Sequence, residues 1–263
     1  MIIDIVKNIN ILGQFCGKRD VSELTSEQLK NKYGIEQADV MVLFGGSILC
    51  GGEIMANAMK NKIAKKYVIV GGAGHTTETL RVKMHEEFPD IETDGLPEAH
   101  VFAKYLKHQY NLEADFLECK STNCGNNITY LLELLKDHGI SFQSIILSQD
   151  ATMQRRMEAG MRKYVNDDVL IINYAVYMAT VVEKNHTLMY EEQIIGMWDV
   201  ERYVNLLMGE IPRLSDDKNG YGPEGKNFIV HVDIPKEVKV AFDKLSKVYS
   251  VREANPLYAS ITE

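Results

Sequence analysis

The stretch DVMVLFGG at residues 39–46 decides the fold. It is a largely apolar run that ends in two glycines, and the pattern returns as YVIVGG at residues 67–72. A continuous apolar run of this length is typical of a strand buried on both faces, as in a parallel sheet with helices on either side. The two runs therefore predict the centre of a parallel α/β sheet.

Strands and helices are predicted to alternate along the chain after these runs. Further short strands are predicted at residues 114–118, 144–147 and 169–174. Helical patterns are predicted from residue 53 to about 63 and at residues 96–110, 126–138 and 153–164. This alternation predicts parallel strands joined by right-handed crossover helices. We assume the strand order 3-2-1-4-5, which places the reversal of the order between the first and fourth strands.

The two ends of the chain lack this alternation. Residues 1–37 are predicted to form two helices, and Thr25 and Gln28 make a capping-box pattern before the second one, which ends near Gly34. Beyond about residue 180 we predict a helix at 191–208, a polar stretch at 212–225, a short strand at 228–233 and a helix at 237–249. We divide the chain into an N-terminal helical segment (1–37), a core domain (38–180) and a smaller, α-rich C-terminal appendage (181–263).

Composition and charge narrow the classes of partner. The chain has 263 residues, of which 37 are acidic and 29 basic, for a net charge of −8. This balance disfavours a nucleic-acid or anionic-membrane partner, which needs a basic face. The four cysteines are scattered and form no CxxC pair, so neither a disulfide framework nor a zinc site is expected. With no run of 18 apolar residues and no basic region typical of a signal peptide, we expect a cytoplasmic protein without a membrane span.

Four turns that follow predicted strands or open predicted helices combine glycine with hydroxyl, amide or carboxyl side chains. They are FGGSILCGG (44–52), GGAGHTTET (71–79), STNCGNN (121–127) and SQDATMQ (148–154). Ligands of open parallel sheets bind beyond the carboxyl ends of the strands, and helix N-termini there attract negative charge. Each turn alone is explained by ordinary turn and capping chemistry, whereas four on one edge predict a small-molecule pocket. Neither GxGxxG nor GxxxxGK[ST] is present, so no standard nucleotide motif applies.

Three side chains on this edge are candidate catalytic groups. His75 follows a glycine turn, and we interpret it either as an acid–base group or as a polar contact. Glu98 begins a predicted helix and is either a catalytic acid or a helix N-terminal charge. Asp150 ends the fourth strand, where capping and ligand contact are both open. His231 and Asp233 alternate along the predicted strand at 228–233 and are interpreted as a structural pair.

Several longer segments resemble one known family. They are GGAGHTTE (71–78), STNCGNN (121–127), DATMQRR (150–156), GMWDVERYVNLLMGEIPRL (196–214) and DDKNGYGPEGKNFIVHVDIP (216–235). These segments are similar to the bacterial YdcF/SanA/ElyC family, which has been classed as a domain of unknown function. The resemblance implies a Rossmann-like, doubly wound domain of five parallel strands with a smaller C-terminal region. It also implies S-adenosyl-L-methionine (SAM) as the ligand.

The resemblance also extends to individual positions. The residues that match the family are Gly71, Gly74, His75, Glu98, Ser121, Thr122, Asn123, Asn127, Asp150, Thr152, Gln154, Arg155 and His231. From the turns themselves we add Gly45, Gly46, Ser47 and Gly72 as ligand contacts. Of the neighbouring Arg155 and Arg156, one is expected to clamp an anion and the other to be a solvated charge. No metal ligands are predicted.

Three functions remain open from the sequence. The first is a SAM-binding protein, with the chemistry of a SAM-dependent transferase, whose pocket lies between residues 45–52 and 148–156 and uses His75, Glu98 and Asp150. The second is a hydrolase or transferase that acts on a phosphorylated sugar, lipid or nucleotide, since anion-binding turns suit it equally well. The third is a non-catalytic ligand-binding or sensor module. The sequence leaves the substrate and the oligomeric state open.

Overall fold

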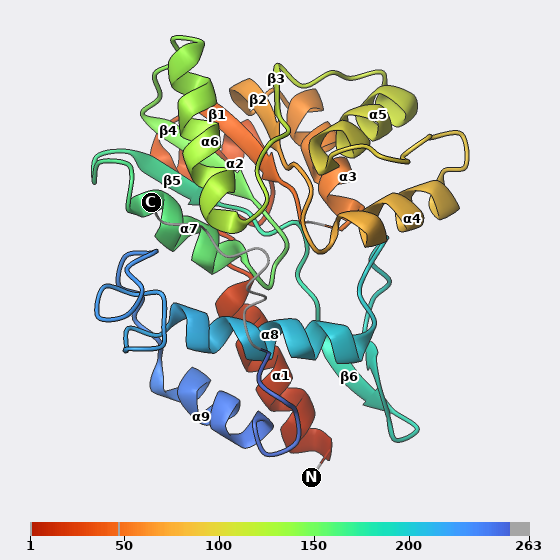
Figure 1. Cartoon of the computed structure of the whole chain (residues 1–263), viewed down its shortest axis with the longest axis vertical. Coiled ribbons are helices and arrows are strands. Elements are labelled where there is room, and N and C mark those ends of the chain that lie inside the picture. Colours follow the sequence, from red (N-terminus) through yellow and green to blue (C-terminus); the bar gives the residue numbers. More distant parts are fainter. Residues whose placement is uncertain (1, 47, 253–263) are drawn as a thin grey trace.

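A computed structural model describes residues 2–46 and 48–252 and shows a parallel sheet flanked by helices (Figure 1). The strands are β1 (Ala38–Phe44), β2 (Ala64–Val70), β3 (Phe116–Glu118), β4 (Ser144–Ser148) and β5 (Leu170–Asn173). Their order is β3-β2-β1-β4-β5. This confirms the Rossmann-like doubly wound fold and the assumed order. The reversal of strand order therefore lies between β1 and β4.

Helices cover the sheet on both faces. They are α2 (Ser26–Tyr33), α3 (Cys50–Lys60), α4 (Thr77–Glu87), α5 (Glu98–Tyr110), α6 (Cys124–Asp137) and α7 (Gln154–Arg162). Val40 and Val42 of β1 face one core with α6 and α7, while Met41 and Leu43 face a second core with α3 and α5. Alternate residues of β1 are thus buried on opposite sides, which explains why the run at 39–44 is apolar without a break.

The caps of α2 agree with the sequence pattern, whereas α4 was not predicted. The Thr25 side chain accepts a hydrogen bond from the N–H of Gln28, and Gly34 ends the helix with a φ of 74°. In α4 only Thr77, Leu80 and Met84 are buried. Three buried positions give too narrow an apolar stripe to reveal the helix in the sequence.

A second layer of helices lies beneath the carboxyl edge of the sheet (Figure 1). It contains α1 (Ile2–Cys16), α8 (Val200–Leu214) and α9 (Lys236–Leu245), with the antiparallel hairpin of β6 (Val181–Lys184) and β7 (Thr187–Tyr190) at one end. The N-terminal helix α1 packs against α8, α9 and β6, so the two ends of the chain build this layer together. No helix of the described residues has both the length and the apolar character needed to cross a bilayer.

Two predictions for the C-terminal region are wrong. The helix predicted at 191–208 begins only at Val200, because Asp199 caps it by accepting a hydrogen bond from the N–H of Arg202. The segment predicted as a strand at 228–233 is not a strand. Among residues 2–46 and 48–252 no strand pairs with it, and its Val230 N–H donates to the carbonyl of Ala159 in α7. As a result His231 contacts Asp216, 2.7 Å away, and the expected side-by-side alternation with Asp233 is lost.

Candidate functional site

Three glycines at the carboxyl ends of β1 and β2 are required by packing. A Cβ atom on Gly45 would lie 2.9 Å from the Cα atom of Gly71. A Cβ atom on Gly72 would lie 2.8 Å from the carbonyl oxygen of Cys119, so a side chain there would strike backbone. These contacts bring the turn after β2 against the end of β1 on one side and the 119–121 segment on the other. The close approach of these segments at the carboxyl edge therefore requires glycine at positions 45, 71 and 72.

Glu98 is buried behind these glycines and joins three segments. It is the first residue of α5 and is 5% exposed. Its carboxylate accepts hydrogen bonds from the N–H of Gly46 at 2.6 Å and from the hydroxyls of Thr77 at 2.9 Å and Thr76 at 3.2 Å. Burial raises the pKa of Glu98, and these three donors oppose the rise. The geometry makes Glu98 a brace between β1, α4 and α5.

Asp150 has the same buried character at the end of β4. It is 1% exposed and accepts from the N–H and the hydroxyl of Thr152 at 2.9 and 2.7 Å. The Tyr177 hydroxyl and the indole N–H of Trp198 also donate to it, each at 2.9 Å. Burial raises the pKa of Asp150, and the hydrogen bonds act in the opposite direction. Asp150 and Thr152 thus fasten the segment before α8 to the sheet.

The space between the ends of β1 and β4 is filled by two glutamine side chains. Gln149 donates from Nε2 to the carbonyl of Gly45 at 2.9 Å. Gln154 accepts from the N–H of Gln149 at 2.9 Å and donates to the carbonyl of Leu147 and to Oδ1 of Asn173, both at 3.0 Å. Both glutamines are fully buried. Gln154 thus holds the turn at 148–154 by these hydrogen bonds. Ser47, the remaining predicted residue of the first turn, lies outside the described residues.

The turns after β2 and β3 lie side by side, as the sequence predicted. The Ser121 hydroxyl accepts from the N–H of Gly72 at 3.3 Å, and the carbonyl of Thr122 is the nearest atom, 3.4 Å away, to a Cβ built on Gly74. Asn123 caps α6 by accepting from the N–H of Asn126 at 2.9 Å. Asn127, one turn into α6, is buried. The structure therefore brings the N-terminus of α6 next to the turn that carries His75.

Four arginines, which we call the arginine group, gather around His75. They are Arg156 on α7, Arg202 and Arg213 on α8, and Arg252. Nη2 of Arg252 lies 3.0 Å from Nε2 of His75. Arg156 makes a two-pronged ion pair with Glu210 of α8 at 2.6 and 3.0 Å, and Arg213 lies 4.0 Å from the same carboxylate.

Burial and the arginine group together determine the charge state of His75. Partial burial of the ring and the positive charges of the four arginines lower the pKa of His75 from 6.5 to about 4. At neutral pH the imidazole is therefore uncharged, and its Nε2 can accept a hydrogen bond from Arg252. A neutral imidazole beside several guanidinium groups can take a proton from a bound ligand or bind near its negative charge.

The structure does not bring Arg155 into this group. Its Nε donates to the carbonyl of Phe15 near the end of α1, and its guanidinium carbon lies 4.2 Å from the centre of the Phe15 ring. Its positive charge thus meets the C-terminal end of a helix dipole. Sequence reasoning missed the two arginines of α8, although a signal existed. Gly209 and Arg213 follow Arg202 by 7 and 11 residues, so the three share one stripe of the helix.

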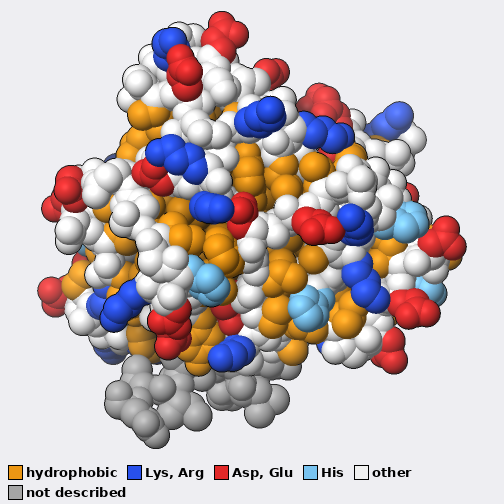
Figure 2. Space-filling model, turned by 90° about the horizontal axis from the view of Figure 1, so that it is seen from above, with side chains coloured by type: hydrophobic (Ala, Val, Ile, Leu, Met, Phe, Trp, Pro, Cys, Tyr) orange, Lys and Arg blue, Asp and Glu red, His pale blue; other side chains and the backbone are white. Residues whose placement is uncertain are grey.

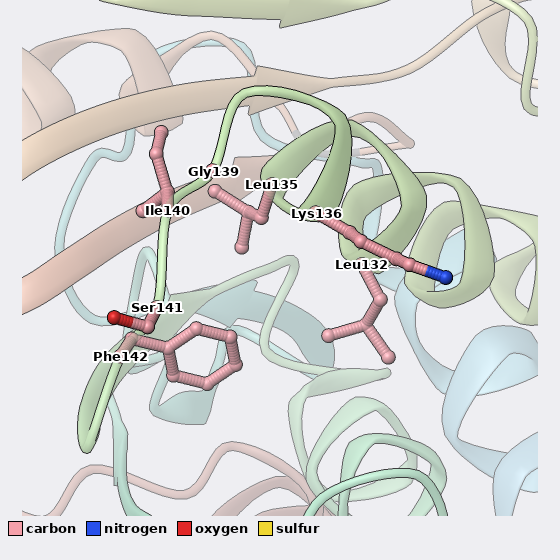
Figure 3. A pocket seen from close by; sticks show the side chains of 7 residues that line it. All are labelled: Leu132, Leu135, Lys136, Gly139, Ile140, Ser141 and Phe142. Carbon is pink, nitrogen blue, oxygen red and sulfur yellow. The ribbon is translucent and has the colours of Figure 1, made fainter.

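One hollow on the surface lies away from these turns. A hollow of about 400 Å³ lies at the amino edge of the sheet, between the end of α6 and the loop before β4 (Figure 3). Leu132, Leu135 and Phe142 line it, and none of its lining residues was predicted for the site. Figure 2 looks onto this end of the molecule and shows apolar side chains across its middle. Within the described residues no cluster of three His, Cys, Asp or Glu side chains could hold a metal ion.

No family model matches the sequence.

Proposed function

We propose that this protein is an enzyme that binds a small anionic molecule at the carboxyl edge of its sheet. The binding region comprises the turn at 71–79, the N-terminus of α6 and the facing stripe of α8. The arginine group carries the proposal. Its positive charges are concentrated at one place in a chain whose net charge is −8, and they surround a candidate acid–base group.

A phosphorylated sugar, lipid or nucleotide fits this charge best. Guanidinium groups bind phosphate oxygens with paired, charge-assisted hydrogen bonds. The N-terminus of α6 lies next to the same turn, and a helix N-terminus favours an anion. His75 is placed to exchange a proton with the bound ligand, as transfer or hydrolysis of a phosphoryl-linked group requires.

SAM is the second candidate, and the sequence resemblance supports it. The turn at Gly46 gives a ligand access, since a Cβ atom there would have only Met153 and Thr76 as neighbours, at 3.5 and 3.7 Å. The carboxylate of SAM could pair with an arginine. Its ammonium and sulfonium groups, however, are positive and gain nothing from the other arginines. The charge of the site therefore ranks SAM below a phosphorylated ligand.

Glu98 and Asp150 support the site in this proposal without contacting the ligand. Each carboxylate is buried and already accepts at least three hydrogen bonds from protein donors. His75 is the catalytic residue that we propose. A non-catalytic binding module would share the arginine group and differ in having no turnover.

A thermal-shift panel at low ionic strength tests the proposal. Sugar phosphates, nucleoside phosphates and SAM are each added at millimolar concentration to the full chain. We expect phosphorylated compounds to raise Tm and Arg202→Gln to reduce the rise. His75→Asn is expected to keep binding and lose turnover of the compound that binds. If no member of the panel raises Tm, the proposal is wrong, and retained turnover in His75→Asn removes the role of His75.

A further inference from the structure

We infer that the arginine group binds a diphosphate, and that Arg252 leaves His75 to contact it. The inference rests on the proposed function and names the chemical class of its ligand. It depends on three observations: the charge of the group, the line that its members form along α8, and the contact between Arg252 and His75.

The charge of the group matches more than one phosphate. Among the described residues, Arg156 and Arg213 pair with one carboxylate, Glu210. The four positive charges of the group and the one negative charge of Glu210 leave three positive charges. A single phosphate ester carries roughly two negative charges near neutral pH, and a second phosphate adds about one more. The negative charge of a diphosphate monoester therefore balances the positive charge of the arginine group. A single carboxylate, such as that of SAM, leaves most of the positive charge of the group without compensation.

The arginines form a line along α8. Arg202 and Arg213 are 11 residues apart on one stripe of the helix, which corresponds to roughly 16 Å along its axis at 1.5 Å per residue. Arg213 reaches back one turn to donate to the carbonyl of Gly209. Arg252 crosses the stripe at this glycine, where a Cβ atom would lie 3.1 Å from the Cβ of Arg252. An elongated anion can contact more of this line than a compact one can.

Arg252 has an uncharged hydrogen-bond partner in the present structure. Arg156 pairs with a buried carboxylate, whereas Arg252 donates to the neutral Nε2 of His75 at 3.0 Å. A hydrogen bond from a guanidinium to a phosphate oxygen is stronger than one to a neutral nitrogen acceptor. A diphosphate therefore competes successfully for Arg252. His75 then lies beside the bound anion without the contact to Arg252, which favours protonation of its ring.

Isothermal titration of the full chain with inorganic pyrophosphate tests the inference. Inorganic phosphate and SAM are titrated in parallel under the same low-salt conditions. We expect pyrophosphate to bind about tenfold or more tightly than phosphate, because it engages further charge-assisted hydrogen bonds. Arg202→Gln and Arg252→Gln are each expected to weaken pyrophosphate binding by about tenfold or more. Arg162→Gln is the matched control, since Arg162 contacts backbone carbonyls at the far end of α7, and it should leave binding unchanged.

The outcomes separate this inference from the proposed function. If phosphate binds as tightly as pyrophosphate, or if SAM binds and Arg202→Gln weakens it, an anion site exists and the diphosphate inference is wrong. If none of the three compounds binds, both are wrong. A nucleoside diphosphate and a short isoprenyl diphosphate, titrated next, show whether the group attached to the diphosphate is a nucleoside or a lipid.

Discussion

At the scale of single residues, the buried carboxylates and the partly buried basic groups have different roles in the site. Asp150 and Glu98 are buried and hold segments together, whereas His75 and the arginine group are the residues that we propose to contact the ligand. A buried carboxylate that accepts several hydrogen bonds contributes to stability mainly because its donors are costly to leave without an acceptor. The chemistry of the proposal therefore rests on the basic residues.

Replacing Asp150 should destabilise the fold. In Asp150→Asn the new amide would face donors such as Tyr177 and Trp198, and at least one of them would lose its acceptor. We expect the free energy of unfolding to fall by roughly 1–3 kcal/mol, measured by chemical denaturation. Asp167→Asn, at an exposed position, is the control and should change little. An Asp150→Asn variant that is as stable as the parent and inactive would instead make Asp150 a catalytic residue.

Anion binding should be accompanied by proton uptake at His75. A bound diphosphate offsets the arginine charges, so the pKa of His75 rises in the complex from its value of about 4 in the free protein. The complex then binds more protons than the free protein in the window above pH 4, and this contribution to affinity grows as pH falls through it. Calorimetry at a pH of about 5.5 in two buffers of different ionisation enthalpy measures the uptake. His75→Asn should take up less, and equal uptake would contradict the proposed role.

At the scale of secondary-structure elements, the segment before α8 is held to the sheet by specific contacts. Lys83 of α4 donates to the carbonyls of Gly196 at 3.1 Å and Met197 at 2.7 Å. Trp198 donates to Asp150, and Asp199 then caps α8. Gly196 has a φ of 72°, and a Cβ atom there would lie 2.9 Å from the backbone nitrogen of Leu49. These contacts fix where α8 begins and so where Arg202 lies.

Gly196→Ala should therefore lower the free energy of unfolding more than a glycine substitution whose only cost is an unfavourable backbone conformation. Gly139 also has a positive φ, of 66°, but apart from its two chain neighbours no atom of the described residues lies within 4 Å of a Cβ built there. Gly139→Ala isolates the conformational cost, about 1 kcal/mol, and the additional loss in Gly196→Ala measures the collision with Leu49. Comparable losses in the two variants, from denaturant titrations, would show that Leu49 moves freely.

Elements with a dense local signal could be predicted from the sequence, and those determined by distant contacts could not. The apolar runs at 39–44 and 67–70 gave β1 and β2, and the capping residues gave α2. The start of α8 depends on Lys83 and Asp150, which lie more than 40 residues away in the chain. The pattern at 228–233 alternates like a strand, yet no strand in the described part of the chain pairs with it.

The candidate site, too, could be predicted from the sequence only in part. The neighbouring positions of His75 and Asn123 followed from the fold, because both turns end at one edge of a parallel sheet. The burial of Glu98 and Asp150 did not follow, since a helix N-terminal glutamate and a turn aspartate can equally face solvent. The arginine group joins α7, α8 and Arg252. Only the three-dimensional packing of the C-terminal region on the sheet brings them together.

At the scale of the whole molecule, the sheet and the second helical layer are joined by buried polar contacts. Trp198 binds Asp150 at the end of β4, and Arg155 of α7 binds the end of α1. The same boundary carries the arginine group, so the ligand site requires both layers. We therefore expect the layers to unfold as one cooperative unit.

The single tryptophan, Trp198, makes this expectation measurable. Its indole is 8% exposed and reports on the boundary, whereas far-ultraviolet circular dichroism reports on all helices. In a urea titration the two signals should change with the same midpoint and slope. A fluorescence transition at clearly lower urea would show that the boundary opens before the sheet unfolds.

The most direct test of the central claim, an anion site beside His75, is the nuclear magnetic resonance spectrum of the full chain with ¹⁵N-labelled histidine during titration with pyrophosphate. His75→Asn assigns the signals of His75, and His138, at the end of α6 on the opposite edge of the sheet, is an internal control. The account predicts that the ring signals of His75 shift with saturable dependence on pyrophosphate while those of His138 stay in place. Binding of pyrophosphate with no shift at His75 would contradict it.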